Sequence, residues 1–451
     1  MQFITTLDYA LLPFFLGIVY AVAYNFRNRH YPRNHPWRRY FIPVLTLKIF
    51  GAIFIGFLYA YYYDGGDTYN YFNHGLIINS SFNESSTKWL NLLFRIPKSS
   101  NGEYFNYINQ MVWYSDPASY TVASISAFVS IFTLNTYLPT AVLFAFISFT
   151  GVWALFRTFA NIYPHLTKQI AIATLFIPST FVWGSGIFKD TICMFGLGWL
   201  TYGSFRMLVK RDFSFKNVLL TIISFVLIAR VKPYILLGYV PALSMWLLFN
   251  YTQRLKNTGV KLLTKFFVIG AVVGGFLFFM QRFGNQTLGK YSFEKLAQTS
   301  LTNRGYIYYI SGEEGSSYSL GNFDATIPGM LSKFPLAVNV TFFRPYPWEA
   351  KKVIVLLSAI EAILFLFFTL KIFFTIGPVK IWRAINTDPT IQFCLIFSII
   401  FAFAVGISSY NFGTLSRYKI PCMPFYALAL ILIYYKHNPP GKFMISRLLK
   451  L

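Results

Sequence analysis

Long apolar stretches, separated by short polar and charged segments, follow one another along the whole 451-residue chain. An α-helix needs about 20 apolar residues to cross the hydrocarbon core of a bilayer. The pattern predicts twelve candidate segments, some of them short enough to require tilting or re-entry. They lie near residues 8–24, 41–61, 119–137, 139–159, 169–187, 190–208, 217–230, 233–249, 265–281, 353–374, 391–408 and 420–435. We therefore expect an all-α, polytopic transmembrane helical bundle with about 11 or 12 membrane segments, forming a single integral membrane domain over residues 1–451.

Composition agrees with a membrane protein, because 55% of the residues are hydrophobic and 12% are charged, against roughly 25% charged in soluble domains. The formal net charge of +24 arises from 39 Lys and Arg residues against 15 Asp and Glu residues. These cations gather in short loops between apolar segments, which is the positive-inside pattern and not a nucleic-acid-binding surface. It predicts an outer N-terminus, a cytoplasmic C-terminus and no nucleic-acid partner. The basic segments are residues 27–39, 210–211, 254–265, 380–383 and 436–450.

This orientation places two long segments, residues 63–118 and 283–351, on the outer face as a first and a second outer loop. An outer N-terminus and a cytoplasmic C-terminus require an odd number of crossings, so one of the twelve segments does not cross. We expect this to be 119–137 or part of 86–137. Most carboxylates fall in the two outer loops. Acidic residues contribute little to orientation, so this distribution predicts a functional outer surface.

The turn Asp64-Gly65-Gly66-Asp67 follows the second apolar segment directly. Two glycines let a tight turn bring both carboxylates toward one centre, either a hydroxyl group or a divalent cation. Ligands that are oxygen only favour Mg, Mn or Ca. The same residues also suit the start of a helix, since Asp accepts hydrogen bonds from free amides and complements the helix dipole. Both interpretations remain open.

Several cations stand where an expected outer loop meets a helix end. They are Arg230 and Lys232, Arg344 beside Glu349, and Arg417 with Lys419. Ionisable groups at membrane depth are expensive and face cavities, and guanidinium groups pair with phosphate oxygens, so a convergent set would bind an anion. The alternative is that each side chain extends to the lipid headgroups.

Polar residues and tyrosines surround Arg304 in the segment 303–317, which is a candidate sugar-binding surface because rings stack on sugar C–H faces. Tyrosines are also common at the membrane interface.

Other charged residues allow two interpretations each. The pair Lys189-Asp190 either belongs to a site or neutralises itself, and Glu361 has either a functional role or a packing role. The three cysteines, Cys193, Cys394 and Cys422, are expected to be core residues without disulfides.

Three patches resemble a known family. Gly66-Asp67-Thr68-Tyr69-Asn70-Tyr71-Phe72 is similar to the opening of bacterial exopolysaccharide polymerases of the EpsG kind, although the second aromatic residue comes earlier than in that pattern. The segments FRPYPWE (343–349) and NFGTLSRYKIP (411–421) resemble those of multi-spanning glycosyltransferases and O-antigen polymerases. The resemblance covers short patches spread over most of the chain.

The resemblance implies a GT-C-like enzyme of the bacterial inner membrane that transfers glycan from a polyprenyl-diphosphate or polyprenyl-phosphate carrier to a sugar hydroxyl on the outer face. It implies that Asp67 acts as a base or metal ligand and that Arg344 and Arg417 hold the diphosphate. Asp64 would assist Asp67 or share a Mg or Mn ion, Arg230 and Lys232 would add positive charge, and Glu349 would orient Arg344. The expected partners are the lipid-linked glycan, membrane lipids and polysaccharide-export proteins.

Two other classes of protein fit the same pattern. A transporter or flippase of a lipid-linked oligosaccharide also needs cationic cavities, but it needs no general base. A non-catalytic membrane subunit of an assembly complex would use the aromatic residues as an interface, and no single outer charge would be essential to it.

Overall fold

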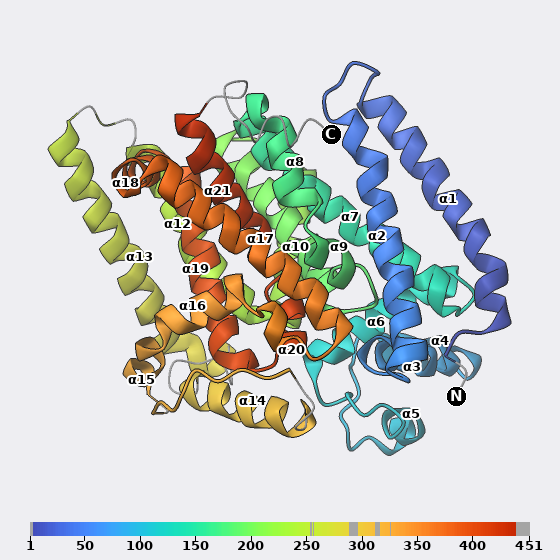
Figure 1. Cartoon of the computed structure of the whole chain (residues 1–451). Coiled ribbons are helices and arrows are strands. Elements are labelled where there is room, and N and C mark those ends of the chain that lie inside the picture. The colour runs from blue at the N-terminus through green and yellow to red at the C-terminus, as the bar shows by residue number, and fades with distance from the viewer. Residues whose placement is uncertain are drawn as a thin grey trace. The chain divides into compact units, whose positions relative to one another are not determined.

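The computed structural model describes residues 3–252, 255, 257–287, 296–311, 316–324 and 326–438. Within these ranges the regular elements are helices, and the β-structure is limited to an isolated bridge between Ser317 and Asn411 (Figure 1). The predicted all-α polytopic class is confirmed. Cys193, Cys394 and Cys422 are buried and free, as expected of core residues.

The chain forms two compact units. Unit 1 comprises residues 1–171 and 180–232, and unit 2 comprises residues 172–179 and 233–451. In chain order the elements up to unit 2's main segment are α1 (Thr6–His30), α2 (Arg38–Phe57), η1 (Leu58–Tyr62), α3 (Asp67–Ser80), η2 (Ser81–Asn83), α4 (Ser86–Leu93), η3 (Gly102–Tyr104), α5 (Phe105–Ile108), α6 (Pro117–Phe132), α7 (Tyr137–Ile162), η4 (Pro164–Leu166), α8 (Thr167–Leu175), α9 (Pro178–Trp183), α10 (Lys189–Ser204), η5 (Phe205–Val209) and α11 (Phe215–Val231).

The main segment of unit 2 begins directly after Lys232. Its elements are α12 (Pro233–Thr252), α13 (Thr258–Thr287), α14 (Leu296–Ser311), α15 (Ile327–Ser332), α16 (Phe334–Phe343), η7 (Pro347–Glu349), α17 (Val353–Ile376), α18 (Pro378–Thr387), α19 (Pro389–Ser409), α20 (Phe412–Tyr418) and α21 (Met423–His437). In this unit α19 packs against α12, α16 and α21.

Seven helices in the described ranges are long and apolar enough to cross a membrane, and α20 with α21, bent by 69°, make an eighth candidate. The protein is therefore a multi-pass membrane protein by its helices. The seven are Thr6–His30, Arg38–Tyr62, Tyr137–Ile162, Lys189–Val209, Pro233–Thr252, Val353–Ile376 and Pro389–Ser409.

Fewer long helices occur than the twelve predicted segments, and local breaks explain part of the difference. The segment 169–187 is divided into α8 and α9, because the residue before Pro178 is disfavoured in a helix. The segment 119–137 ends early as α6, since Leu134 and Asn135 adopt positive φ angles. The segment 217–230 forms α11, a helix of 17 residues, and 265–281 belongs to α13.

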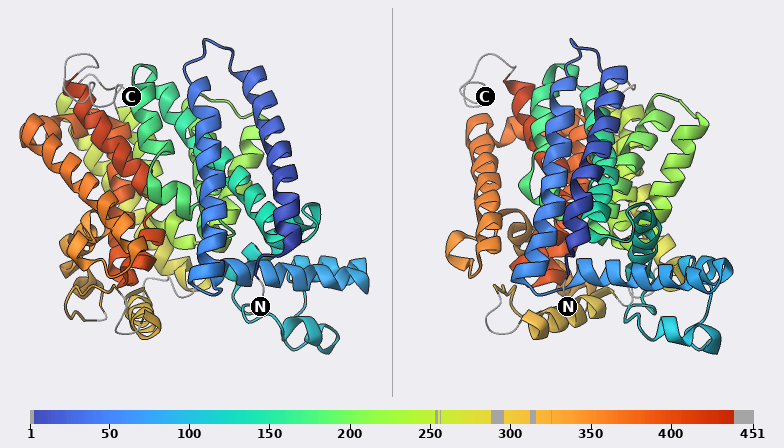
Figure 2. Two further views of the ribbon diagram at one scale, coloured as in Figure 1. Left: turned by 45° about the vertical axis from the view of Figure 1, so that its right-hand side comes forward. Right: turned by 90° about the vertical axis from the view of Figure 1, so that its right-hand side faces the viewer.

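The expected first outer loop, residues 63–118, is itself largely helical. It contains α3, α4 and α5, and α3 crosses the end of α2 rather than continuing it (Figure 2). Ile78, Leu92, Tyr107 and Met111 share a hydrophobic core with Tyr120 at the start of α6. This segment is therefore a packed part of unit 1. Its orientation toward the outer face and that of both termini remain predictions.

In unit 1, α7 packs against α1, α2 and α10. The contact between α7 and α10 is close, because a Cβ atom on Gly198 would lie 1.8 Å from the Gly151 carbonyl oxygen. Small residues let helix backbones approach in this way.

Asp8 connects α1 to α7. One of its carboxylate oxygens accepts from the Thr5 amide and hydroxyl, and the other accepts from the Leu138 amide of α7 at 2.8 Å.

Replacing Asp8 by alanine should destabilise the protein by roughly 1–3 kcal/mol, because the buried amide of Leu138 loses its acceptor. Asp8→Asn keeps one carbonyl acceptor and should lose less. The free cysteines allow thermal unfolding of the purified protein to be followed with a fluorogenic maleimide. Equal unfolding midpoints for wild type and Asp8→Ala would contradict a stabilising role for the hydrogen bond between Asp8 and the Leu138 amide.

Candidate functional site

The Asp64–Asp67 turn is fixed by its backbone. Asp64, Gly65 and Gly66 have φ angles of 50°, 110° and 124°, and a Cβ atom on Gly66 would lie 2.9 Å from the Tyr59 ring. Glycine suits both positions because it has no side chain to oppose a positive φ. Asp64 is exposed, whereas Asp67 is half-buried in the first turn of α3, where its charge complements the helix dipole.

Four further charged side chains gather around the start of α10. The Lys189 ammonium lies 3.2 Å from the Asp116 carboxylate, and the Lys232 ammonium pairs with the buried Asp190. Lys189 is also close enough to Asp67 and to Lys232 for electrostatic interaction. We call Asp67, Asp116, Lys189, Asp190 and Lys232 the charged cluster. All five belong to unit 1.

Lys189 and Asp190 are adjacent in sequence, yet each pairs with a residue from elsewhere in unit 1. The Lys232–Asp190 pair is almost fully buried, with 5% and 0% of the two side chains exposed. The Lys189 side chain keeps 20% of its surface exposed. The first pair is therefore part of the protein interior, whereas the Lys189 side chain is partly exposed.

Asp116 is held in its ionised form. Burial alone would raise the pKa of this carboxyl, but hydrogen bonds from the Ser119 hydroxyl and amide and the Lys189 ammonium lower the pKa to about 2. Because the folded-state pKa lies below the unfolded value of about 4, Asp116 stabilises the fold above that pH, and the contribution disappears as pH falls through about 2. Asp116 thus faces Lys189 as an anion at neutral pH.

The break between α9 and α10 supports the cluster. Lys48, fully buried in the middle of α2, donates to the Gly184 carbonyl at 2.5 Å and lies 3.5 Å from the Thr180 carbonyl. Ser148 of α7 donates to the same Gly184 carbonyl at 2.8 Å. Carbonyl groups at the end of α9 would otherwise lack partners. These contacts fix the residues that lead into Lys189.

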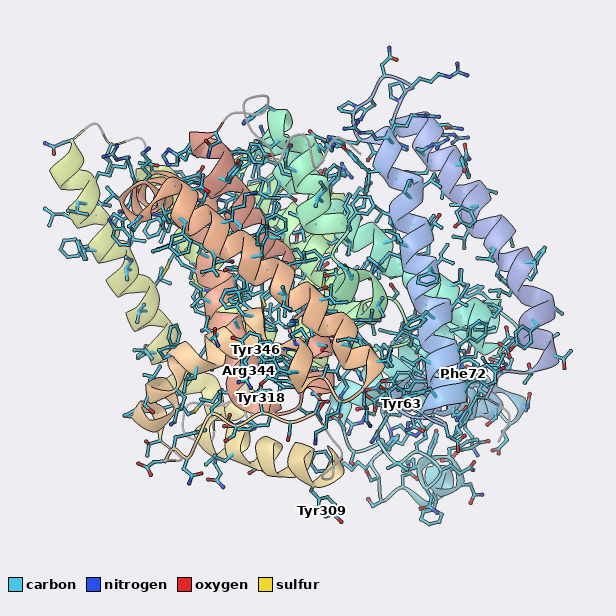
Figure 3. All side chains as sticks on the ribbon, in the orientation of Figure 1. Tyr63, Phe72, Tyr309, Tyr318, Arg344 and Tyr346 are labelled. Atoms are coloured by element: carbon cyan, nitrogen blue, oxygen red, sulfur yellow. The ribbon has the colours of Figure 1, made fainter. Side chains whose placement is uncertain are left out.

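A second polar group lies in unit 2, where Arg344 pairs with Glu349. The Arg344 Nε atom donates to Glu349 at 3.0 Å, its Nη2 atom donates to the other oxygen, and the Tyr346 amide donates to the same carboxylate at 2.8 Å. Burial would raise the pKa of Glu349, but these donors lower it. The ring centroids of Tyr318, Tyr346 and Phe412 lie within 6.0 Å of the guanidinium carbon. Figure 3 shows Tyr318 and Tyr346 beside Arg344. Glu349 makes the contact that orienting Arg344 requires.

Buried polar atoms meet elsewhere in unit 2. The Glu361 carboxylate in α17 accepts from the Ser179 amide at 2.7 Å, and Glu361 interacts electrostatically with Lys419, which follows α20 and is fully buried. The other Glu361 oxygen, the Ser179 hydroxyl and the Lys419 ammonium have no hydrogen-bond partner among the described residues. Such groups are rare in folded proteins and call for an explanation.

The remaining predicted residues lie at helix ends or outside the described residues. Arg417 is half-buried in the last turn of α20, and Arg230 is exposed at the end of α11. Arg304 belongs to α14, but its side chain lies outside the described residues, as do residues 312–315 of the expected sugar surface.

The predicted residues thus divide between the units: Asp64, Asp67, Arg230 and Lys232 belong to unit 1, and Arg304, Arg344, Glu349, Arg417 and Lys419 belong to unit 2.

Asp64 and Asp67 alone are two carboxylates, and the described residues contain no group of three or more His, Cys, Asp or Glu side chains placed to hold a metal ion. A Mg or Mn ion at this turn would take its remaining ligands from water or substrate oxygens. The metal remains a prediction.

No protein-family model, curated protein or solved structure matches this chain.

The buried pair predicts a test. Asp190→Ala leaves the Lys232 ammonium buried without its carboxylate and should destabilise the protein by roughly 3–5 kcal/mol. The double variant Asp190→Ala with Lys232→Met removes both charges and should recover much of the loss. Lys88→Met, which removes an exposed pair with Glu84, should change the unfolding midpoint little. A double variant no more stable than Asp190→Ala would contradict the pairing.

Proposed function

We propose that the protein is a membrane glycosyltransferase that extends a glycan using a sugar donor carried on a polyprenyl phosphate or diphosphate. The observation that carries this proposal is the position of Asp67, half-buried at the start of α3 and within electrostatic range of the partly exposed Lys189. A carboxylate beside a cation, directly after a 25-residue apolar helical segment, suits a reaction on a lipid-linked substrate.

The reaction requires one base and one cationic group that stabilises the negative charge of the leaving group. An acceptor sugar hydroxyl attacks the anomeric carbon of the donor, and Asp67 takes the hydroxyl proton. The bond between the anomeric carbon and the phosphate oxygen breaks, and its electron pair leaves with the lipid diphosphate. Lys189 stabilises the charge that develops on this leaving group. An ammonium group has three donors, so Lys189 can bind a phosphate oxygen while it contacts Asp116.

The other members of the cluster position these two groups. Asp116 holds the Lys189 ammonium, and the Lys232–Asp190 pair fixes the first turn of α10. Asp64, exposed three residues before Asp67, is proposed to assist Asp67 or to share a divalent cation with it. Arg230 is proposed to add positive charge in unit 1. The phosphate-binding roles of Arg344 and Arg417 remain predictions for unit 2 by itself. Inner-membrane location and export partners follow from the same proposal.

Exposed aromatic rings in unit 2 are proposed to form a glycan-contacting surface of that unit. Trp348 is 81% exposed and stacks on Tyr346 with ring centroids 5.0 Å apart. Tyr309 on α14 is 86% exposed and points away from its helix (Figure 3). Exposed rings of this kind offer flat apolar faces to sugar C–H groups.

A transporter of a lipid-linked oligosaccharide is the second candidate, and the group of Ser179, Glu361 and Lys419 favours it. Its unpartnered atoms belong to side chains that are 8%, 4% and 0% exposed. The group also meets two interrupted helices, α8–α9 and α20–α21. Interrupted helices and buried ionisable residues mark substrate or ion pathways in membrane transporters.

The two candidates differ in which carboxylate is essential. We expect Asp67→Asn to reduce polymer formation by roughly 10²–10⁴-fold, the usual contribution of a general base, with partial recovery in Asp67→Glu. The measurement is the chain length of surface polysaccharide in a deletion strain complemented with each variant, with protein levels checked by immunoblot. Asp324→Asn, an exposed carboxylate in unit 2, serves as the control and should support normal chains.

If the protein is a transporter, Glu361→Gln should stop polymer export while Asp67→Asn supports normal chain length. The enzyme proposal predicts that Asp67→Asn leaves short lipid-linked units. Normal chains from Asp67→Asn at wild-type protein level would contradict it. Normal chains from both variants would favour a non-catalytic subunit.

A further inference from the structure

A cavity of about 610 Å³ lies at the loop that joins α1 to α2. Its lining includes four arginines, Arg27, Arg33, Arg38 and Arg39, together with His35. The loop and the Asp64–Asp67 turn lie at opposite ends of α2 (Figure 2). Since the cavity is lined by residues of this loop and of the start of α2, it lies away from that turn. It is therefore a different site from the one proposed for glycan transfer.

Among the described residues, no carboxylate pairs with the arginines of this cavity. The sequence contains no Asp or Glu between Asp8 and Asp64. The Arg33 side chain is exposed. Four adjacent guanidinium groups without a carboxylate favour the binding of an anion.

Hydrogen bonds hold two of the four arginines of the cavity in place. Arg38 donates to the Tyr31 carbonyl at 2.6 Å and to the Asn28 side chain at 2.7 Å, while Arg27 donates to the same Asn28 oxygen at 3.1 Å. The two guanidinium groups are thus fixed around one amide. Guanidinium groups pair with phosphate oxygens in a bidentate geometry, which an ammonium does not provide.

His35 lines the cavity and contributes little to its positive charge. Its Nδ1 atom lies 3.2 Å from the Trp37 amide, which donates to it, and burial lowers its pKa. The imidazole is therefore neutral at pH 7, and the positive charge of the cavity comes from the arginines.

An apolar stripe on α1 leads to the cavity. Phe14, Ile18, Val22 and Phe26 recur every fourth residue and are 62%, 42%, 50% and 41% exposed. Side chains four residues apart lie on one face of a helix, so the stripe ends next to Arg27. An exposed apolar face on a membrane helix contacts hydrocarbon chains. A phosphate group in the cavity would thus have its lipid chains in contact with α1, which favours a lipid phosphate over a free one.

We propose that this cavity binds the phosphate group of an anionic lipid whose hydrocarbon chains lie along the exposed stripe of α1. Basic pockets between membrane helices are suited to lipid headgroups of this charge. The shared chemistry is the phosphate group, and the lipid is distinguished from free phosphate by its chains. This proposal does not depend on the proposed glycosyltransferase activity.

The test uses the purified full-length protein in detergent and measures binding by native mass spectrometry. Phosphatidylglycerol should bind roughly tenfold or more tightly than phosphatidylcholine, and the double variant Arg33→Gln with Arg39→Gln should lose roughly tenfold in affinity for phosphatidylglycerol. Arg211→Gln is the matched control, because Arg211 is an exposed cation of another short basic loop. It should leave phosphatidylglycerol binding unchanged.

Two results would overturn the proposal. An equal loss in Arg211→Gln and in the double variant would show general attraction to a basic surface rather than a site. Competition by inorganic phosphate or glycerol phosphate at the concentration at which phosphatidylglycerol binds would show a free-phosphate site without a lipid. Val22→Ser distinguishes the sources further, since it should weaken phosphatidylglycerol binding and leave inorganic phosphate binding unaffected.

Discussion

A charge buried among membrane helices must be paired, and unit 1 meets this requirement through residues far apart in the sequence. The Lys232 ammonium at the end of α11 pairs with Asp190 in the first turn of α10. Lys48 is buried within α2, and its ammonium donates to the Gly184 carbonyl just after α9 rather than to a carboxylate. Removing one partner of such a pair is far more damaging than replacing both. The break between α9 and α10 therefore depends on polar contacts from α2, α7 and α11, and this break positions Lys189 beside Asp116 and Asp67.

The two ends of α2 have opposite electrostatic character. At its start, four arginines line a cavity without a carboxylate. Beyond its end, the exposed Asp64 and the half-buried Asp67 lie on a glycine turn, and Asp67 lies near Lys189. A membrane helix separates two aqueous interfaces, so the two sites would meet different lipid leaflets. The proposed lipid site at one end and the proposed glycan-transfer site at the other thus use the same helix as a common support.

Hydropathy predicted the long helices well, because a segment in lipid must satisfy its own backbone and only helices do so within one segment. The segments 353–374 and 391–408 correspond closely to α17 and α19. The Arg344–Glu349 contact was also predictable, since five residues separate the partners. The Lys189–Asp116 pair was not, because 73 residues separate its members and no local pattern links them. Lys48 did offer a signal in the sequence, because it is a single cation within an apolar segment. The packed helices within 63–118 were missed because their apolar residues are mixed with polar ones.

Zero-length carbodiimide cross-linking tests most directly whether carboxylates assemble around the Lys189 ammonium. The reagent joins a carboxylate to an amine only when the two are in contact, and the Lys88–Glu84 pair, 2.9 Å apart, serves as the positive control. We predict a cross-linked peptide joining Lys189 to Asp116, with Asp67 as the second partner when Asp116 is replaced by Asn. Cross-linking of the Lys88 control without any product at Lys189 would contradict the charged cluster and the function proposed for it.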